Sequence, residues 1–477
     1  MFLSIRSGLA AAIMAVELST TRTRGARMPE VAARTNSIGE EPRQRTWLWW
    51  TVALLVAGLA LGDFYYCVVL KNNDFLWHRG LGETFVNRSV YEFGRHYLPA
   101  RVMIDAATVW MPYRVDRAVW LLSMCVGLAI CVRFWSLLGV DPNSPAAQTR
   151  VWLGPALLGL GAVGSYLQRD LAECGLQIAL LCMLTGGLAA LLRGRPGLCG
   201  FSLGLAVAYK LTPLLFLPFL LWKRQWKAAA WMGVWTVLIS LAPALYLGWQ
   251  GNVSAHRQWL DFTIKNMTLE DPSENGVEPP VMHNQALALA IARLFQAYPS
   301  DHPLRESNVG LVQFAQLSAH DTKLIVQGAL LMLAGALAWR FRRPVDTSDG
   351  GVSLGAEWSA VCILSAILSP LCWLQHLMLV VPAVLLIART LATGRAQRWQ
   401  WGATGLILAI TLLIHRDLLG KTITSTLTSC SPHTVATLLM VLLTLTSSPA
   451  SQLALATEKA STWKFARRAR RRAPAAA

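Results

Sequence analysis

Apolar segments separated by polar loops follow one another along most of this chain. A helix that crosses the hydrocarbon core of a bilayer needs about 20 apolar residues, and eight segments approach that length. They lie at about 47–70, 117–139, 150–167, 174–192, 228–249, 322–340, 399–414 and 433–447. The pattern predicts an all-α polytopic membrane protein with about eight full spans.

A further apolar segment, 198–222, does not fit a single crossing. It carries Lys210 and Pro213 in its middle, and basic residues border both of its ends, at 193–195 and 223–227. Because basic residues beside a span mark the cytoplasmic side, the segment is expected to enter, turn near the lysine and proline, and return as two short helices. The alternative is one continuous span, which would leave Lys210 near the bilayer centre at a cost of about 2.5–3.5 kcal/mol.

The segment 357–390 shows the same features and predicts a second hairpin, because it is basic at both ends and interrupted by Ser369-Pro370 and by the polar stretch 373–376. With both hairpins, the basic clusters fall on one side of the membrane, at 1–46, 133–150, 193–195, 223–227, 340–343, 389–398 and 464–472. The polar loops fall on the other side, at 71–116, 168–173, 250–321 and 415–432. The hairpin tips, which carry Lys210 and His376, are expected to face the side of these loops.

The composition agrees with a membrane protein. Hydrophobic residues make up 54% of the 477 residues and charged residues 14%, where a soluble domain has about 25% charged residues. Much of the net charge of +17 lies near the two ends, and basic tails beside hydrophobic spans set topology and contact anionic lipid. We expect a basic cytoplasmic N-terminal tail (1–46), a multi-pass catalytic domain (47–450) and a basic C-terminal tail (451–477), with both termini on the cytoplasmic side of a bacterial inner (plasma) membrane.

Several common cofactor motifs are absent from the sequence. There is no GxxxxGK[ST], no HExxH and no CxxC pair, and these motifs hold nucleotides or metals. We therefore expect no cofactor and no metal, and any activated donor has to come from the membrane or from outside the cell.

The loop after the first span holds a candidate general base, Asp74. A carboxylate at the rim of a cavity could deprotonate an acceptor hydroxyl, although a solvated loop aspartate would leave the same pattern. Asp63 and Asp170 are the next candidates, and Asp63 would need a partner to be tolerated inside the membrane.

Lys210, beside the expected helix break, is the main candidate cation. It could hold a phosphate leaving group as a point charge, or it could be a structural lysine that reaches toward the surface. Arg101, Arg169 and Arg293 are further cations on the same side, and each could equally be an interfacial anchor. Asn284 and Gln285 could cap a helix or belong to a site, and His376 could be an interior histidine.

The order of these residues resembles glycosyltransferase family 87. The resemblance covers about residues 60–450, and no one of its motifs is specific alone. It rests on Asp74-Phe75, the stretch 97–99 with Tyr97, Gln168, the stretch 204–213 with Lys210 and Pro213, Asn284-Gln285 with Arg293, and the stretch 368–376 with Trp373 and His376. Two stretches depart from the family pattern: Ser165 to Gln168 replaces a Gly-Gln turn, and Gln375 stands where the family has the first histidine of W-x-H-H.

This resemblance implies a GT-C-like fold and transfer of a hexose, with mannose as the expected sugar, from a polyprenyl-phosphate donor to a glycan or lipid-linked acceptor on the extracytoplasmic side, with inversion. It implies Asp74 as the base and Lys210, with Arg101 or Arg293, as the group that stabilises the lipid phosphate. Substrate contacts are expected from the other residues on this face: Tyr97, Gln168, Arg169, Asn284, Gln285, Trp373 and His376. The alternatives are a transporter or flippase of lipid-linked sugars, which also uses broken helices, and a membrane scaffold without catalysis.

Overall fold

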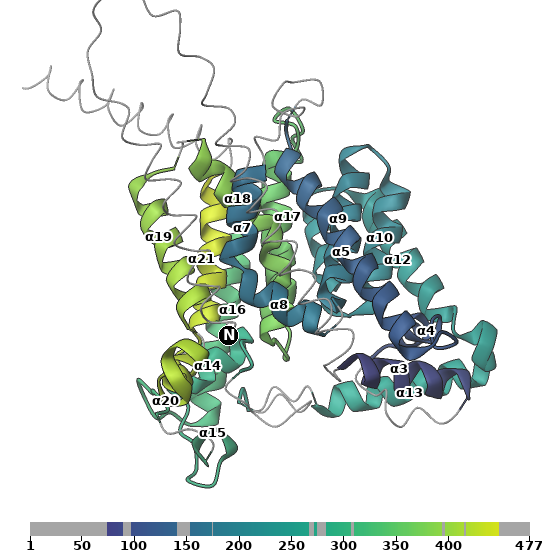
Figure 1. Cartoon of the computed structure of the whole chain (residues 1–477), viewed down its shortest axis with the longest axis horizontal. Coiled ribbons are helices and arrows are strands. Elements are labelled where there is room, and N and C mark those ends of the chain that lie inside the picture. The colour runs from purple at the N-terminus through teal and green to yellow at the C-terminus, as the bar shows by residue number, and fades with distance from the viewer. Residues whose placement is uncertain are drawn as a thin grey trace, which may run out of the picture. The chain divides into compact units, whose positions relative to one another are not determined.

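The computed structural model describes residues 74–447, except for 89–96, 141–152, 174, 267–270, 274–282, 307–309, 394–395 and 415. The expected N-terminal tail, the first span at 47–70 and the C-terminal tail lie outside these residues. Within them, the regular structure is helical, apart from an isolated bridge between Gln296 and Leu317 (Figure 1). The prediction of an all-α protein is confirmed for this part of the chain.

Some of the described helices are long and apolar enough to cross a membrane by themselves. They are α5 (Tyr113–Leu137), α16 (Ala319–Arg340) and the continuous stretch of η4 (Leu374–Val380) and α18 (Val381–Ala392). Three further pairs of helices are long and apolar enough to cross only when the two helices are taken together, and each pair is bent. They are α8 (Gly164–Ala172) with α9 (Leu176–Leu192), α12 (Trp226–Leu241) with α13 (Ala244–Asn266), and α19 (Arg398–Leu408) and η5 (Ala409–Leu413) with α20 (Arg416–Ser429). The total of about eight spans stays a prediction.

The expected hairpin at 198–222 is formed by three short helices: α10 (Pro196–Tyr209), η3 (Thr212–Leu215) and α11 (Phe216–Trp222). A Cβ atom on Gly200 would meet Trp231 and Met232, and one on Gly204 would meet Trp235 and Thr236. A step of four residues along α10, from Gly200 to Gly204, corresponds to a step of four residues in the same direction along α12. The two helices therefore run parallel. Two parallel helices in succession require the chain between them to return, which α11 does.

Pro213 explains why α10 ends at Tyr209. A proline has no N–H to donate to the carbonyl four residues earlier and its ring collides with that carbonyl, which here belongs to Tyr209. Lys210 accordingly leaves the helix in an extended conformation (φ −151°, ψ 129°). The break therefore lies at the lysine, as the sequence predicts.

The second hairpin consists of α17 (Val352–Ile367), an irregular turn at 368–373, and the return through η4 and α18. Both of its ends lie near the end of α5, because Gly355 closely approaches the side chain of Leu138 and Arg389 donates a hydrogen bond to the Leu138 carbonyl. The hairpin is confirmed, but its return arm, Leu374–Ala392, is long enough to span a membrane by itself, whereas two short arms were expected.

Two other predicted spans end earlier than expected. The segment 150–167 gives only α7 (Leu153–Ala162), and most of the expected connector at 168–173 is helical, because α8 continues to Ala172. The segment 228–249 stops at Leu241 and bends by 94° into α13. Pro243 explains that bend, because it cannot donate to the carbonyl of residue 239.

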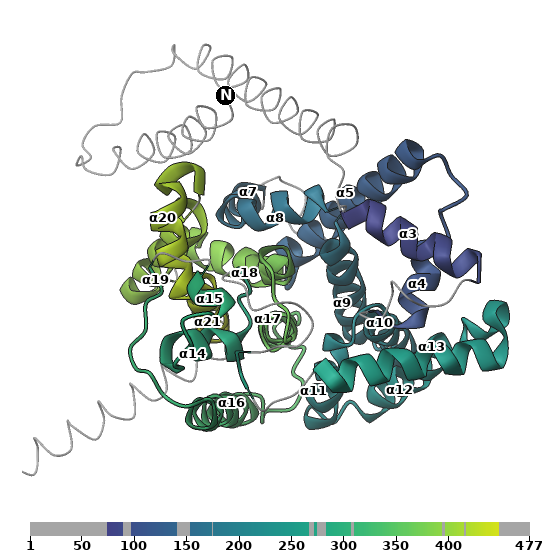
Figure 2. The same ribbon diagram turned by 90° about the horizontal axis from the view of Figure 1, so that it is seen from below.

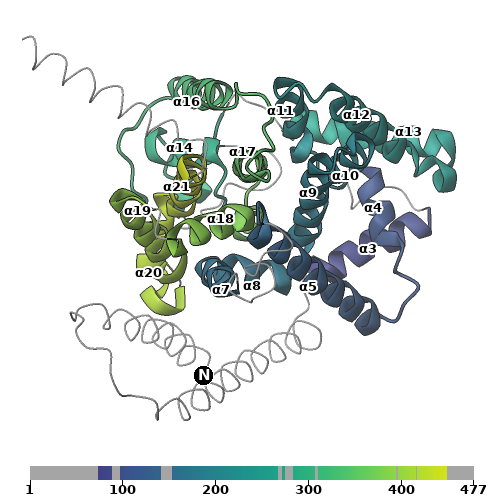
Figure 3. The same ribbon diagram turned by 90° about the horizontal axis from the view of Figure 1, so that it is seen from above.

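The remaining helices complete the described chain. They are α3 (Asp74–Val86), α4 (Pro99–Ala106), α14 (Leu287–Phe295), α15 (Pro303–Glu306) and α21 (Pro432–Ser447). Figures 2 and 3 show α9, α17, α18 and α21 in the interior of the bundle, with α12, α16 and α19 outside them. Trp358 of α17, fully buried, donates to the Leu184 carbonyl of α9 at 3.1 Å and so ties two of the interior helices together.

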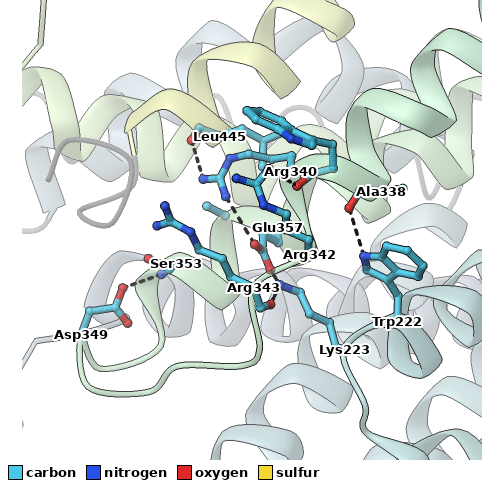
Figure 4. A network of polar contacts seen from close by, with 12 residues as sticks. Trp222, Lys223, Ala338, Arg340, Arg342, Arg343, Asp349, Ser353, Glu357 and Leu445 are labelled. Atoms are coloured by element: carbon cyan, nitrogen blue, oxygen red, sulfur yellow. Dashed lines mark hydrogen bonds and ion pairs between the residues drawn. The ribbon is translucent and has the colours of Figure 1, made fainter. Parts of the chain in front are cut away.

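Basic residues from the predicted cytoplasmic clusters meet at one end of the bundle (Figure 4). The Lys223 ammonium lies 2.5 Å from Glu357 and donates to the Arg343 carbonyl at 2.7 Å. Arg340 contacts Glu357 at 3.5 Å and donates to the Leu445 carbonyl at 2.9 Å. This network joins the end of α11 to α16, α17 and α21, so it holds the return arm of the first hairpin in place. From the sequence, Lys223 was expected only to mark the cytoplasmic side of the membrane.

Candidate active site

The tip of the first hairpin places Lys210 among polar groups from several helices. Asp170 of α8, Arg101 of α4, Cys372 of the 368–373 turn and His376 lie within electrostatic range of its ammonium. Among the described residues, no carboxylate lies within 4 Å of it. Within the described part of the chain, Lys210 is therefore a partly buried cation whose charge no direct ion pair neutralises.

Arg101 lies beside this lysine but is already paired. Its side chain is buried, and its Nε and Nη2 atoms each lie 3.0 Å from Oδ1 of Asp105, one turn later on α4. The guanidinium also lies 3.7 Å from the centre of the Tyr209 ring and 5.7 Å from that of Tyr97. Since Tyr209 directly precedes Lys210, Arg101 fixes α4 against the hairpin tip.

Asp105 and His78 complete this buried group. Burial by itself would raise the pKa of Asp105, but the charges and hydrogen bonds of Arg101 and His78 outweigh it, so the pKa lies below its ordinary value. Nδ1 of His78 is 3.4 Å from Asp105, and the His78 ring lies 5.3 Å from the ring of Tyr97. Neither His78 nor Asp105 was expected from the sequence to belong to the site. The i, i+4 spacing of Arg101 and Asp105 on a helix could have indicated their pairing.

The expected general base, Asp74, is the first residue of α3, and its side chain lies outside those that the structure describes. His78 is one helical turn further along the same helix. The position of the Asp74 carboxylate relative to Lys210 therefore stays a prediction.

Asp170, by contrast, is fully buried and serves the fold. Its two carboxylate oxygens accept hydrogen bonds from the backbone N–H groups of Gln177 and Ile178, each at 3.0 Å. The first N–H groups of a helix have no carbonyl acceptor within the helix, and Asp170 accepts from two of them in α9. The neighbouring Gln168 and Arg169 are exposed on α8, and Arg169 pairs with Glu173 at 3.0 Å.

Asn284 and Gln285 hold the turn of the second hairpin instead of capping a helix. The Asn284 amide donates to the Pro370 carbonyl at 3.0 Å and accepts from the Cys372 N–H at 2.9 Å. The Gln285 N–H donates to the Cys372 carbonyl at 2.6 Å. Helix α14 begins after Ala286 without a side-chain cap. The side-chain amide of Asn284 and the backbone N–H of Gln285 therefore fix a turn that lies 86 or more residues further along the chain.

That turn leads directly into Trp373 and His376. Nδ1 of His376 lies 3.0 Å from the Leu371 carbonyl and 3.2 Å from the Trp373 N–H. The backbone thus engages this ring nitrogen, and the other nitrogen, Nε2, is the one that can face a ligand. His376 and Lys210 come from the two hairpin tips, as expected, and the imidazole lies within electrostatic range of the ammonium.

Arg293 belongs to a different group of residues. Its buried guanidinium donates to the Ser431 hydroxyl at 2.6 Å, in the turn between α20 and α21, and it interacts electrostatically with Tyr298 and Cys430. The structure thus brings Lys210, Arg101, Tyr97 and His376 together and places Arg293 on Ser431. In the described ranges, no three His, Cys, Asp or Glu side chains are arranged to hold a metal ion.

Comparisons with known proteins show what the chain is similar to in sequence. The model of glycosyltransferase family 87 matches residues 96–370, more than half of the chain. A polyprenol-phosphate-mannose-dependent alpha-(1-2)-phosphatidylinositol mannoside mannosyltransferase of Mycobacterium tuberculosis is 26% identical over 370 residues, which cover 71% of this chain and 76% of the relative. The protein of the same description from Mycolicibacterium smegmatis is 28% identical over 276 residues, 57% of this chain and 54% of the relative. No solved structure matches the chain significantly.

Proposed function

Because the chain belongs to glycosyltransferase family 87, we propose that this membrane glycosyltransferase transfers mannose from polyprenyl-phosphate-mannose to a glycan or lipid-linked acceptor. The observation that carries the proposal is Lys210: a cation without a direct ion pair among the described side chains, at a helix break, and within electrostatic range of His376. Such a group suits an anionic leaving group that is present only when the donor is bound. The names of both mycobacterial relatives, which specify this donor, support the choice.

In the proposed reaction, the acceptor hydroxyl attacks the anomeric carbon of mannose. The new bond joins the acceptor oxygen to that carbon while the bond from the carbon to the phosphate oxygen breaks, and the lipid phosphate leaves with the electron pair. Asp74 takes the hydroxyl proton. Lys210 stabilises the charge that develops on the phosphate, an electrostatic contribution of the kind that dominates many enzymes. Attack opposite the leaving group inverts the anomeric configuration.

The other residues have supporting roles in this scheme. Arg101, which is paired with Asp105, holds the tip that carries Lys210, and Nε2 of His376 binds the phosphate or the sugar. Asn284 and Gln285 hold the turn before His376. Tyr97 and Trp373 offer aromatic surfaces to the sugar, and Gln168 and Arg169 lie exposed on α8, where a second substrate can reach them.

We further propose that the site faces the extracytoplasmic side. The basic residues Lys223, Arg340 and Arg343 meet at the end of the bundle opposite the hairpin tips, and basic residues beside spans favour the cytoplasm. A lipid-linked donor is available at an extracytoplasmic surface, where nucleotide sugars are not.

A transfer assay in membranes tests the proposal. Membranes that contain the wild-type chain, Asp74→Asn or Asp301→Asn receive radiolabelled polyprenyl-phosphate-mannose, and the label in endogenous acceptors is followed at equal expression. Asp301, exposed in a polar loop, provides a matched control. We expect transfer by the wild type and by Asp301→Asn, and loss in Asp74→Asn. Equal transfer by Asp74→Asn would move the base elsewhere, and no transfer by the wild type would exclude this donor.

A further inference from the structure

Helix α13 lies across the end of the bundle that carries the hairpin tips. The axis of its first 20 residues makes an angle of 94° with α12, and Figures 1 and 2 show it lying crosswise below α10 and α12. Helix α12 exposes an apolar surface along its length, with Trp231, Val234, Val237 and Leu238. Such a surface belongs in the hydrocarbon of the bilayer, so α13 runs parallel to the membrane plane where that surface ends.

Gly248, whose backbone is not helical (φ 75°, ψ 167°), divides α13 into two helical pieces. Three different faces run along the piece after Gly248. The first is buried against the protein and includes Asn252 and Ala255. The second is apolar and exposed: Trp249, Val253 and Leu260 are 64%, 47% and 48% exposed. At about 100° per residue, these three positions fall within about 40° of one another on the helix surface.

The third face is polar and exposed, and it consists of Ser254, Arg257 and Asp261. At the same angle per residue, it is turned by roughly 80–100° from the apolar stripe. A helix with one exposed apolar stripe and one exposed polar stripe suits a boundary between two solvents, as interfacial amphipathic helices do. A tryptophan in the apolar stripe fits the same boundary, where tryptophan is enriched.

Contacts on both sides of the Gly248 kink fix the orientation of α13. Asn252 donates to the Ser240 carbonyl in the last turn of α12 at 3.3 Å. Tyr246 donates to the Val86 carbonyl of α3 at 2.6 Å, and its ring stacks on Phe85 with 5.4 Å between the centres. Leu247 packs on the same small core, formed by α3 and α4. Helix α13 is thus joined to the two helices that lead to Arg101 and the Lys210 tip.

We propose that α13 rests in the interface of the lipid bilayer, with Trp249, Val253 and Leu260 in the lipid and Ser254, Arg257 and Asp261 in water. The exposed apolar surface of α12, the helix that directly precedes α13, identifies lipid as the occupant of this stripe. Through Tyr246 and Leu247, the depth of α13 in the interface sets the level of α3 and α4. The candidate active site is thereby held at the height where the phosphate of a membrane lipid lies.

Cysteine accessibility in lipid nanodiscs tests this orientation with two pairs of adjacent positions. The full chain carries Val253→Cys or Ser254→Cys, and Leu260→Cys or Asp261→Cys, and reacts with a charged, membrane-impermeant maleimide. The rate of the unsubstituted chain is subtracted, and complete labelling in SDS gives the total. We expect cysteines at 253 and 260 to react at least tenfold more slowly than those at 254 and 261. A nitroxide on the same cysteines gives a second measurement, with oxygen relaxing the labels at 253 and 260 more than a water-soluble nickel complex does.

Equal and fast labelling within each pair would show that water covers the apolar stripe and would overturn the proposal. Slow labelling at all four positions would also overturn it, because it would show that a protein surface, from a second copy or a partner, covers both exposed faces.

Discussion

The guanidinium of Arg101 lies 3.7 Å from the centre of the Tyr209 ring. Tyr209 is the last residue of α10, and Lys210 follows it at the helix break. Arg101 is at the same time paired with Asp105 in a buried site. The loop that follows the first predicted span thus contacts the hairpin tip through Arg101, whose charge Asp105 neutralises. The neighbouring Lys210 remains as the cation that can bind an anionic ligand.

Replacement of Arg101 by methionine is expected to destabilise the protein strongly. Removing one partner of a buried ion pair leaves the other charge uncompensated and costs about 3–5 kcal/mol. The double variant Arg101→Met/Asp105→Leu should recover a large part of that loss, because no buried charge is left alone. Thermal unfolding of the purified chain in detergent measures both effects. A double variant that is less stable than Arg101→Met would contradict the pairing.

Asp105 also gives a prediction about pH. Because its pKa in the folded chain lies below the ordinary value of 3.8, the carboxylate stabilises the fold above that value, and the stabilisation is lost as the pH falls through the folded-state pKa. The difference in unfolding temperature between wild type and Asp105→Asn should be constant from pH 8 to 5 and shrink only below about pH 4. A difference that disappears already between pH 7 and 5 would show that another group controls the pair.

Asn284 is expected to matter through the turn that it holds. Asn284→Ala leaves the Pro370 carbonyl without its donor and the Cys372 N–H without its acceptor. Each buried backbone group left unpaired costs about 1–3 kcal/mol. We expect a lower unfolding temperature and reduced transfer. Asn284→Asp keeps the acceptor but loses the donor, so its unfolding temperature should also fall below that of the wild type. Wild-type values for both variants would show that the turn holds its shape by itself.

Removal of divalent metals should leave the transfer unchanged. In the proposed reaction the donor is a lipid phosphate without a nucleotide, and the cation that faces it is Lys210. Membranes treated with EDTA and assayed with labelled polyprenyl-phosphate-mannose should therefore transfer at the untreated rate. Activity that is lost with EDTA and restored by Mg²⁺ or Mn²⁺ would mean that a metal shares this task.

The sequence predicts the two hairpins because their causes are local. Pro213 ends α10, Ser369-Pro370 lies in the break after α17, and basic residues at both ends of each segment require the chain to return. The contacts of Asn284 with Pro370 and Cys372 were beyond such reasoning, since they join segments 86 residues apart. Similarly, the sequence indicates Lys210 and His376 as tip residues, but only the fold shows that Arg101 is neutralised and that Arg293 contacts Ser431.

The helix break at Val163 and the bend after Leu241 were missed for a different reason. Their flanking residues are apolar enough to continue a span, and hydropathy does not record the direction of a helix. Pro243 is a local signal for one of these bends, whereas Val163, which lies between two glycine-containing stretches, gives only a weak one.

The role of Lys210 is tested most directly by the kinetics of a matched pair of variants. Lys210→Ala and Lys227→Ala remove the same side chain, from the hairpin tip and from the exposed basic cluster at the opposite end. Transfer from polyprenyl-phosphate-mannose is measured over a range of donor concentrations. Loss of one preorganised group that stabilises developing charge lowers the rate by about 10²–10³, so we expect kcat/KM for the donor to fall about 100-fold or more in Lys210→Ala and to stay at the wild-type value in Lys227→Ala. A Lys210→Ala variant with wild-type kcat/KM would contradict the assignment of the phosphate to this lysine.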